Sequence, residues 1–135
     1  MTTETVLDAT LERVVPARFP EVGPLRREAD AFVTPFSDDT LREKLVLVVS
    51  ELCTNAIEAL DDPSAQFILR VRGLDDAIVV EVEDNGPGFT QAFFKRGAAD
   101  DAERGRGLSV VLSVVDDFSV ERKRGVTTVH CVLNR

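Results

Sequence analysis

The sequence predicts an α+β fold, a two-layer α/β sandwich in which helices cover one face of a mixed, largely antiparallel sheet. Two observations predict it. Apolar residues recur at helical spacing in three segments, and five shorter runs rich in β-branched residues are bounded by Gly, Pro or Asp. Because a helix with one apolar stripe must bury it against another element, helices packed on one sheet face satisfy both patterns.

Three helices are predicted. The first spans residues 21–32, and the second follows Ser37 as its N-cap and runs to about Leu60. Residues 61–63, Asp-Asp-Pro, end the second helix, because a residue that precedes proline avoids the helical conformation. The buried face of the third helix is predicted from the spacing i, i+3, i+4 and i+7 of Leu108, Val111, Leu112 and Val115.

Five strands are predicted, at residues 10–15, 67–71, 77–83, 118–122 and 126–133. The last two are joined by a turn near Gly125. Residues 90–106 lack periodicity and are rich in small and polar side chains, which predicts a mobile loop or short helix. We expect a single domain over residues 1–135, because the chain has no internal repeat, no linker composition and too few residues for a second core.

Charge and hydropathy narrow the function classes. The formal net charge of −8 argues against direct nucleic-acid binding and suits a partner with basic patches. No run approaches the roughly 20 apolar residues that span a bilayer, and Glu4 and Asp8 stand where a signal peptide carries positive charge. We therefore expect a cytoplasmic protein with no membrane partner. Cys53 and Cys131 lack metal-site spacing and are expected to be reduced, packed thiols.

The most informative motif is the segment 84–89, Asp-Asn-Gly-Pro-Gly-Phe, directly after an apolar strand. An ionised carboxylate at the end of a strand, here Asp84, can accept a hydrogen bond from an exocyclic amino group such as adenine N6. Gly86 and Gly88 permit positive φ and leave space where a Cβ would meet a base or ribose. The alternative is an ordinary surface turn between strands.

A second motif lies in the second predicted helix, at residues 50–56. Glu51 and Asn55 are one helical turn apart and project from the same side, while Leu52 and Ala56 bury the other side. Magnesium prefers hard oxygen ligands, so the Asn55 amide oxygen can join phosphate oxygens around the ion. The alternative is an exposed helix face with no role in binding.

The third motif, residues 103–108 (Glu-Arg-Gly-Arg-Gly-Leu), opens the third predicted helix. Backbone N–H groups at a helix N-terminus attract anionic oxygens, and Gly105 and Gly107 remove side chains that would block their approach. A triphosphate can bind there, with Arg104 and Arg106 adding positive charge. The alternative is a flexible helix start with two solvated arginines.

In this order and at these separations, the three motifs resemble the N, G1 and G2 boxes of the Bergerat-fold ATP-binding superfamily. The resemblance implies ATP and Mg²⁺ as cofactors, Asn55 as the magnesium ligand, and Glu51 as the catalytic acid that acts as base or orienter. It implies nucleotide contacts at Asn55, Asp84, Gly86, Gly88, Arg104, Gly105, Gly107, Leu108 and Thr127.

Within that superfamily the chain resembles the anti-sigma-factor serine/threonine kinases. Residues 15–18 look like their first strand and turn, and residues 125–127 look like their last turn, where Thr127 joins the hydrogen bonds around adenine. Arg104 matches a lid arginine that reaches the terminal phosphate. A histidine kinase needs a phosphoacceptor histidine on a dimerisation helix, whereas the only histidine, His130, falls in a predicted strand.

The resemblance implies a kinase that phosphorylates a small anti-sigma-factor antagonist and sequesters a sigma factor when the antagonist is absent. It also implies a homodimer through the first strand and helix. Glu58 departs from the family, where many members carry histidine, and adds negative charge near the phosphates. Two alternatives therefore stay open: a non-catalytic ATP-binding module that captures partners, and a stand-alone ATPase.

Overall fold

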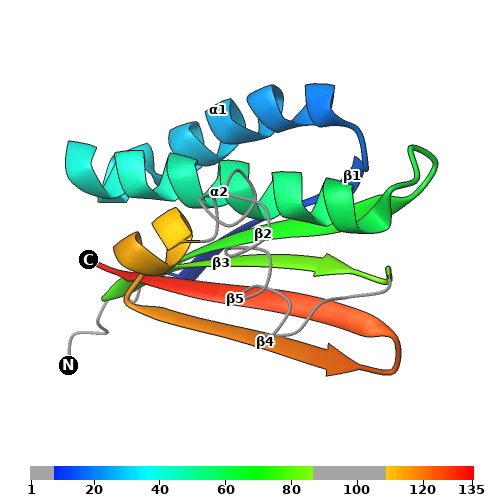
Figure 1. The fold of residues 1–135 in the computed structure, drawn as a ribbon. Coiled ribbons are helices and arrows are strands. Elements are labelled where there is room, and N and C mark those ends of the chain that lie inside the picture. Colours follow the sequence, from blue (N-terminus) through cyan, green and yellow to red (C-terminus); the bar gives the residue numbers. More distant parts are fainter. Residues whose placement is uncertain (1–7, 87–108) are drawn as a thin grey trace.

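The computed structural model describes residues 8–86 and 109–135 (Figure 1). In chain order the elements are β1 (Asp8–Pro16), the 3-10 helix η1 (Phe19–Glu21), α1 (Val22–Val33), the 3-10 helix η2 (Thr34–Phe36), α2 (Asp39–Leu60), β2 (Gln66–Leu74), β3 (Ala77–Asp84), β4 (Asp117–Lys123) and β5 (Val126–Asn134). Residues 109–114 form a further helical segment ahead of β4.

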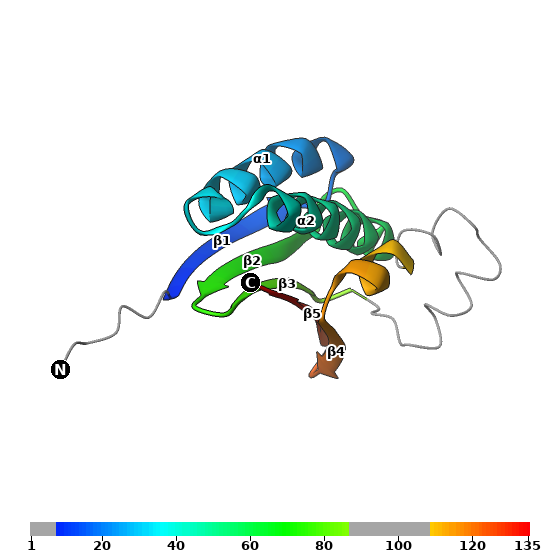
Figure 2. The same cartoon turned by 90° about the vertical axis from the view of Figure 1, so that its left-hand side faces the viewer.

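The five strands form one sheet in the order β1-β2-β3-β5-β4. All four pairings between described strands are antiparallel, so the mixed pairing that the sequence allowed is not observed there. Figures 1 and 2 show α1 and α2 on one face of this sheet, which confirms the predicted two-layer α+β sandwich. In the described ranges, no helix has the length and apolar character needed to cross a bilayer.

The core lies between α2 and the inner face of the sheet. Alternate residues of each strand point inward, and α2 contributes a buried stripe that includes Leu45, Val48 and Leu52. Each such side chain stabilises the fold by roughly 1.5–3 kcal/mol when fully buried. The inward residues of the three central strands are Phe67, Leu69 and Val71, then Ile78, Val80 and Val82, then Val129, Cys131 and Leu133.

The outer face of the sheet carries charged side chains instead. Arg70 on β2 donates to Glu12 on β1 at 2.6 Å and to Glu83 on β3 at 2.9 Å. His130 on β5 lies 2.9 Å from Glu81 on β3, as expected for an ordinary sheet residue. The sheet therefore separates an apolar inner layer from a solvated charge network.

Asp38, not Ser37, is the N-cap of α2. The Asp38 carboxylate accepts a hydrogen bond from the Leu41 N–H at 2.8 Å, and its negative charge suits the positive end of the helix dipole. The Ser37 hydroxyl is buried without a partner in the described part of the chain. The predicted end of the helix is confirmed, because Asp61 leaves it in the left-handed conformation with a φ of 47°.

The third helix differs from its predicted face. Val111 is fully buried as expected, but Leu112 is 47% exposed, so its predicted burial is wrong. Val115 packs against the core as predicted, and Val114 packs there in place of Leu112. Leu108 lies outside the described residues.

The two cysteines behave as packing residues. Cys53 and Cys131 are both buried and unbonded, which confirms reduced thiols. Burial raises the pKa of each thiol to about 12, with the Asp117 charge adding to the effect at Cys131. Both thiols therefore stay protonated near neutral pH.

A two-residue turn joins β4 to β5. Arg124 and Gly125 both have positive φ, 54° and 79°, the conformation that keeps the twist of a tight hairpin. This confirms the predicted turn. It fixes the register so that Arg122 on β4 lies opposite Thr127 on β5.

Candidate functional site

Three polar side chains lie side by side at one end of the sheet. Thr127 pairs with Asp84 of β3 on one side and with Arg122 of β4 on the other. All three positions continue the inward-facing series of their strands, so the row lies on the face that the helices cover. Asp84 and Thr127 were both expected at the nucleotide site, and the structure brings them together.

Asp84 and Thr127 are the buried polar side chains of the described chain, 4% and 0% exposed. A polar group inside an apolar core is costly unless it is hydrogen-bonded. Burial raises the pKa of Asp84, while the Gly86 N–H and the Arg122 charge oppose that rise. With one backbone N–H bonded to it, this buried carboxyl group at a strand end has acceptor sites left for further hydrogen bonds.

Gly86 closes the row beside Asp84. Its N–H donates to the Asp84 carboxylate at 2.9 Å. A Cβ at Gly86 would lie 2.8 Å from Leu60 Cδ2 and 3.2 Å from Asp84 Oδ1, so any added side chain would force these neighbours to shift. The positive φ expected at Gly86 is not observed. Among the described glycines, the one with positive φ is Gly125.

The contact between Gly86 and Leu60 sets the last turn of α2 against this end of the sheet (Figure 1). Asn55 lies further back on α2, and its amide nitrogen is buried without a hydrogen-bond partner in the described ranges. Such orphaned polar groups are rare in native proteins and call for an explanation, for example an ordered water or an ion. Leu52 and Ala56 are buried on the other side of the helix, as predicted.

Glu51 lies one turn before Asn55 on α2 and is partly buried. No hydrogen bond joins Glu51 or Asn55 to the Asp84 row in the described chain. The other expected nucleotide contacts lie outside the described residues: Gly88, Arg104, Gly105, Gly107 and Leu108. The residues that are described fit an adenine nucleotide, because they combine a buried acceptor, a buried hydroxyl, a glycine at a close approach and an orphaned amide.

Arg122 is a site residue that the sequence analysis missed. Its Nη1 donates to the Thr127 hydroxyl oxygen at 2.6 Å and to the Gly86 carbonyl at 3.1 Å. Two signals point to it. The positive-φ turn predicts which residues pair across the hairpin, and alternation from Phe118 and Val120 predicts that Arg122 faces inward.

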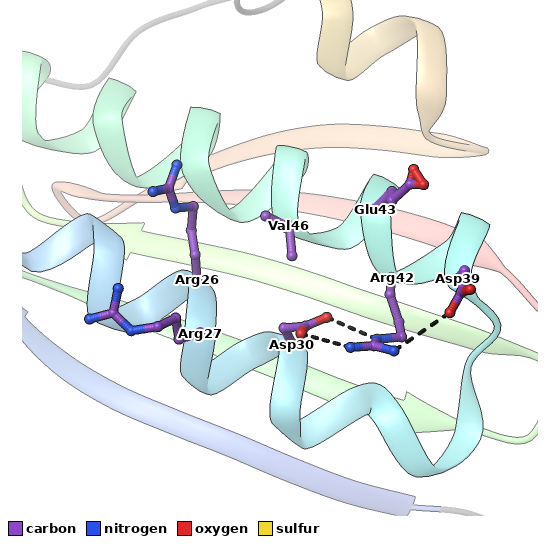
Figure 3. A pocket seen from close by; sticks show the side chains of 7 residues that line it. All are labelled: Arg26, Arg27, Asp30, Asp39, Arg42, Glu43 and Val46. Atoms are coloured by element: carbon purple, nitrogen blue, oxygen red, sulfur yellow. Dashed lines mark hydrogen bonds and ion pairs between the residues drawn. The ribbon is translucent and has the colours of Figure 1, made fainter.

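A separate hollow lies between α1 and the first half of α2 (Figure 3). Part of its lining is already paired: Arg42 donates to both Asp30 oxygens, at 3.0 and 2.9 Å. The Arg42 guanidinium lowers the pKa of Asp30 through these bonds. The hollow is lined by Arg26, Arg27, Asp30, Asp39, Arg42, Glu43 and Val46. It includes none of the predicted site residues, and we interpret it as a structural tie between the two helices.

A protein-family model described as a histidine kinase-like ATPase domain matches residues 15–133. The chain belongs to this family. The match runs from the end of β1 to the last residues of β5 and contains every expected site residue. The match confirms the predicted resemblance to the superfamily of histidine kinase-like ATPases. Domains of this family bind ATP.

The structure comparison agrees with the family. The fold is similar to the crystal structure of the RsbU and RsbW domains of Rv1364c from Mycobacterium tuberculosis, with a TM-score of 0.69 and 16% sequence identity. The alignment covers 94% of this chain and 33% of that chain, so the histidine kinase-like ATPase domain spans about a third of its relative. A sequence search of curated proteins finds no match. The comparison supports a Bergerat-type fold.

Proposed function

We propose that this domain is a serine/threonine protein kinase of the anti-sigma-factor type. It binds ATP with Mg²⁺, phosphorylates a small anti-sigma-factor antagonist and sequesters a sigma factor when the antagonist is absent. The observation that carries the proposal is the buried pair Asp84 and Thr127, at the end of the sheet in a histidine kinase-like ATPase domain. The similarity to a structure that contains an RsbW domain supports the branch.

The base end of the proposed site is formed by the sheet. The Asp84 carboxylate accepts a hydrogen bond from the adenine amino group, and Thr127 completes the hydrogen bonds around the base. Gly86 keeps the space beside Asp84 free of a side chain. By resemblance, Gly105 and Gly107 hold the phosphates and Arg104 reaches the terminal phosphate. Gly88 leaves space beside the base or ribose, and Leu108 is a further nucleotide contact.

The reactive end is formed by α2. We assign the Asn55 amide oxygen as the protein ligand of Mg²⁺, which neutralises phosphate charge when bound. Glu51 accepts the proton of the substrate hydroxyl while the hydroxyl oxygen forms a bond to the γ-phosphorus. The bond between the γ-phosphorus and the β–γ bridging oxygen breaks, and ADP leaves. Because Glu51 and Asn55 are one turn apart, both groups serve the same γ-phosphate.

The decisive experiment replaces Glu51. We expect Glu51→Ala to lower phosphoryl transfer from γ-labelled ATP to a candidate antagonist by at least about 100-fold, because the acceptor loses its base. ATP affinity, measured by calorimetry, should stay within about twofold, since Glu51 is not assigned to ATP binding. Glu43→Ala is the matched control, because Glu43 is an exposed acid on the same helix outside the site. Equal phosphorylation by wild type and Glu51→Ala would remove the assignment.

A second candidate is a non-catalytic ATP-binding module that captures its partner. The observation that favours it is Glu58, an acid one turn beyond Asn55 where many members of the family carry histidine. Like charges near the phosphates weaken nucleotide binding or turnover. In the labelling assay, nucleotide-dependent capture of partner without transfer would support this module, and ATP hydrolysis without a protein acceptor would support a stand-alone ATPase.

A further inference from the structure

Arg122 joins three strands at the base end of the site. It projects from β4, donates to the Thr127 hydroxyl of β5, and donates to the carbonyl of Gly86 just after β3. Gly86 is therefore held from both sides, since its own N–H donates to the Asp84 carboxylate. One side chain fixes the positions of Asp84, Gly86 and Thr127 relative to each other.

The bond from Arg122 also leaves the Thr127 proton free to bond to a ligand. A hydroxyl has one proton to donate and lone pairs to accept, whereas a guanidinium can only donate. Because the Thr127 oxygen accepts from Arg122 at 2.6 Å, its own O–H remains a donor. Asp84, as a carboxylate, remains an acceptor.

The charge of Arg122 supports the same arrangement. Burial disfavours the ionised form of Asp84, and the nearby guanidinium favours it. Glu83, next to Asp84 in β3, acts in the opposite sense but turns to the outer face and bonds to Arg70. Arg122 is thus the cation that favours an ionised Asp84 at the inner face of the described sheet.

We propose that Arg122 is the positioning residue for base recognition, fixing Thr127 as a donor beside Asp84 as an acceptor so that the site selects a 6-aminopurine. Adenine offers an amino donor next to a ring-nitrogen acceptor, which matches this pair. Guanine offers the reverse order, an oxygen acceptor next to an N–H donor, and is rejected in the same pose. This inference rests on the proposed ATP binding and deepens it.

The test compares ATP with inosine triphosphate, which keeps the sugar and phosphates but carries an oxygen acceptor and a ring N–H donor where adenine carries its amino donor and ring-nitrogen acceptor. Binding of both to the full chain is measured by calorimetry with Mg²⁺ present. We expect wild type to prefer ATP, and Arg122→Met to weaken ATP about tenfold while changing the analogue by less than about twofold. Lys123→Met is the control, because it removes one charge from the opposite face of the same strand and should leave both affinities unchanged.

A double-mutant cycle separates positioning from general structural support. Thr127→Val removes the hydroxyl on which Arg122 acts, so Arg122→Met should cause much less further loss of ATP selectivity in that background. Should Arg122→Met fail to fold by circular dichroism, Arg122→Lys takes its place. The lysine side chain keeps the positive charge but is shorter and reaches Gly86 and Thr127 less well. We therefore expect the preference for ATP over the analogue to fall about threefold.

Each other outcome overturns the inference. If Arg122→Met weakens both nucleotides equally, Arg122 acts on the phosphates or on the fold. If the preference for ATP is unchanged in Arg122→Met, or in Arg122→Lys where that variant replaces it, Arg122 does not act on the base. If the losses of ATP affinity in Arg122→Met and Thr127→Val add in the double variant, Arg122 does not act through Thr127. If folded wild type binds neither nucleotide, the proposed function fails together with the inference. If wild type binds ATP and the Arg122 variant binds it with the same affinity, only the inference fails.

Discussion

Asp30 and Asp84 each lie near an arginine, yet the two regions use the arginine differently. In the hollow between α1 and α2, Arg42 donates both its bonds to Asp30, and each side chain is about one-third exposed, 33% and 32% (Figure 3). At the sheet end, Arg122 donates to the neighbours of Asp84 instead, and Asp84 is 4% exposed. The first acid is satisfied by its partner, whereas the second keeps the capacity to accept hydrogen bonds from a ligand.

The pKa directions follow from this difference. The bonds from Arg42 lower the pKa of Asp30, and burial raises that of Asp84 although a cation is near. A perturbed acid in a buried, partly satisfied setting is the kind found at functional sites, whereas the Asp30 pair is typical of a structural tie.

The largest expected effect is on nucleotide affinity. We expect Asp84→Asn to weaken ATP binding by about 100-fold or more, because a hydrogen bond from the base to a buried charged acceptor is lost. Asp30→Asn is the matched control and should leave ATP affinity within about twofold. Calorimetry with ATP and Mg²⁺ on the two folded variants checks both values. A comparable loss in the two variants would mean that the hollow, too, belongs to the binding site.

A smaller effect is expected at the close approach of α2 to the sheet. We expect Gly86→Ala to weaken ATP binding by about three- to tenfold, because the added Cβ forces the Leu60 side chain and the Asp84 carboxylate to shift. The cost in stability should be about 1 kcal/mol, the low end of the range for overpacking, since Leu60 Cδ2 is the far end of a flexible side chain. Calorimetry and urea unfolding measure the two quantities.

Gly23→Ala is the control for Gly86→Ala. An added Cβ at Gly23 in α1 meets Arg27 Nη1 at 3.7 Å, an ordinary contact, and alanine favours a helix. We expect unchanged affinity and a gain of up to about 1 kcal/mol. Unchanged affinity in Gly86→Ala as well would show that the close approach is not needed for binding.

The smallest expected effects are opposite pH dependences of stability. The folded pKa of Asp84 lies above its ordinary value of 3.8, so the folded state binds the proton more readily, and Asp84 lowers stability as pH rises through that window. The folded pKa of Asp30 lies below 3.8, so Asp30 adds stability that is present above this value and lost as pH falls through the lowered pKa.

Urea midpoints of wild type and the two variants check these signs. Relative to wild type, Asp84→Asn should be more stable at neutral pH and equal to it in acid, where the wild-type carboxyl is protonated. Asp30→Asn should be less stable at neutral pH and approach wild type in acid. The same sign in both variants would contradict the distinction between the two acids.

Most elements were predictable because apolar periodicity reports which face of a segment is buried. The predicted end of α2 agrees with the structure, and each predicted strand end lies within three residues of the observed one. β2 continues past the predicted Val71 to Leu74, because Arg72 and Gly73 pair with strands on both sides. That pairing is a property of neighbours in space, which single-segment patterns do not contain.

The candidate site was predictable in part, through residue types that are unusual in their setting. An acid after an apolar strand marked Asp84, and resemblance marked Thr127. Arg122 was missed because an arginine near a turn is common, and only the register across the hairpin gives it inner-face contacts. The prediction that Leu112 is buried was wrong, because the spacing of apolar residues shows which of them share a helix face but not how a short helix is rotated against the sheet.

The left-handed pair Arg124 and Gly125 has a consequence for the role proposed for Arg122. If the two-residue turn is kept, adding one residue to this connection would slide β4 by one position and turn every β4 side chain to the other face. The guanidinium would then point to the solvated side, and Lys123 would face the nucleotide in its place. Loop length, which is usually free to vary, is here under the same constraint as the binding residues themselves.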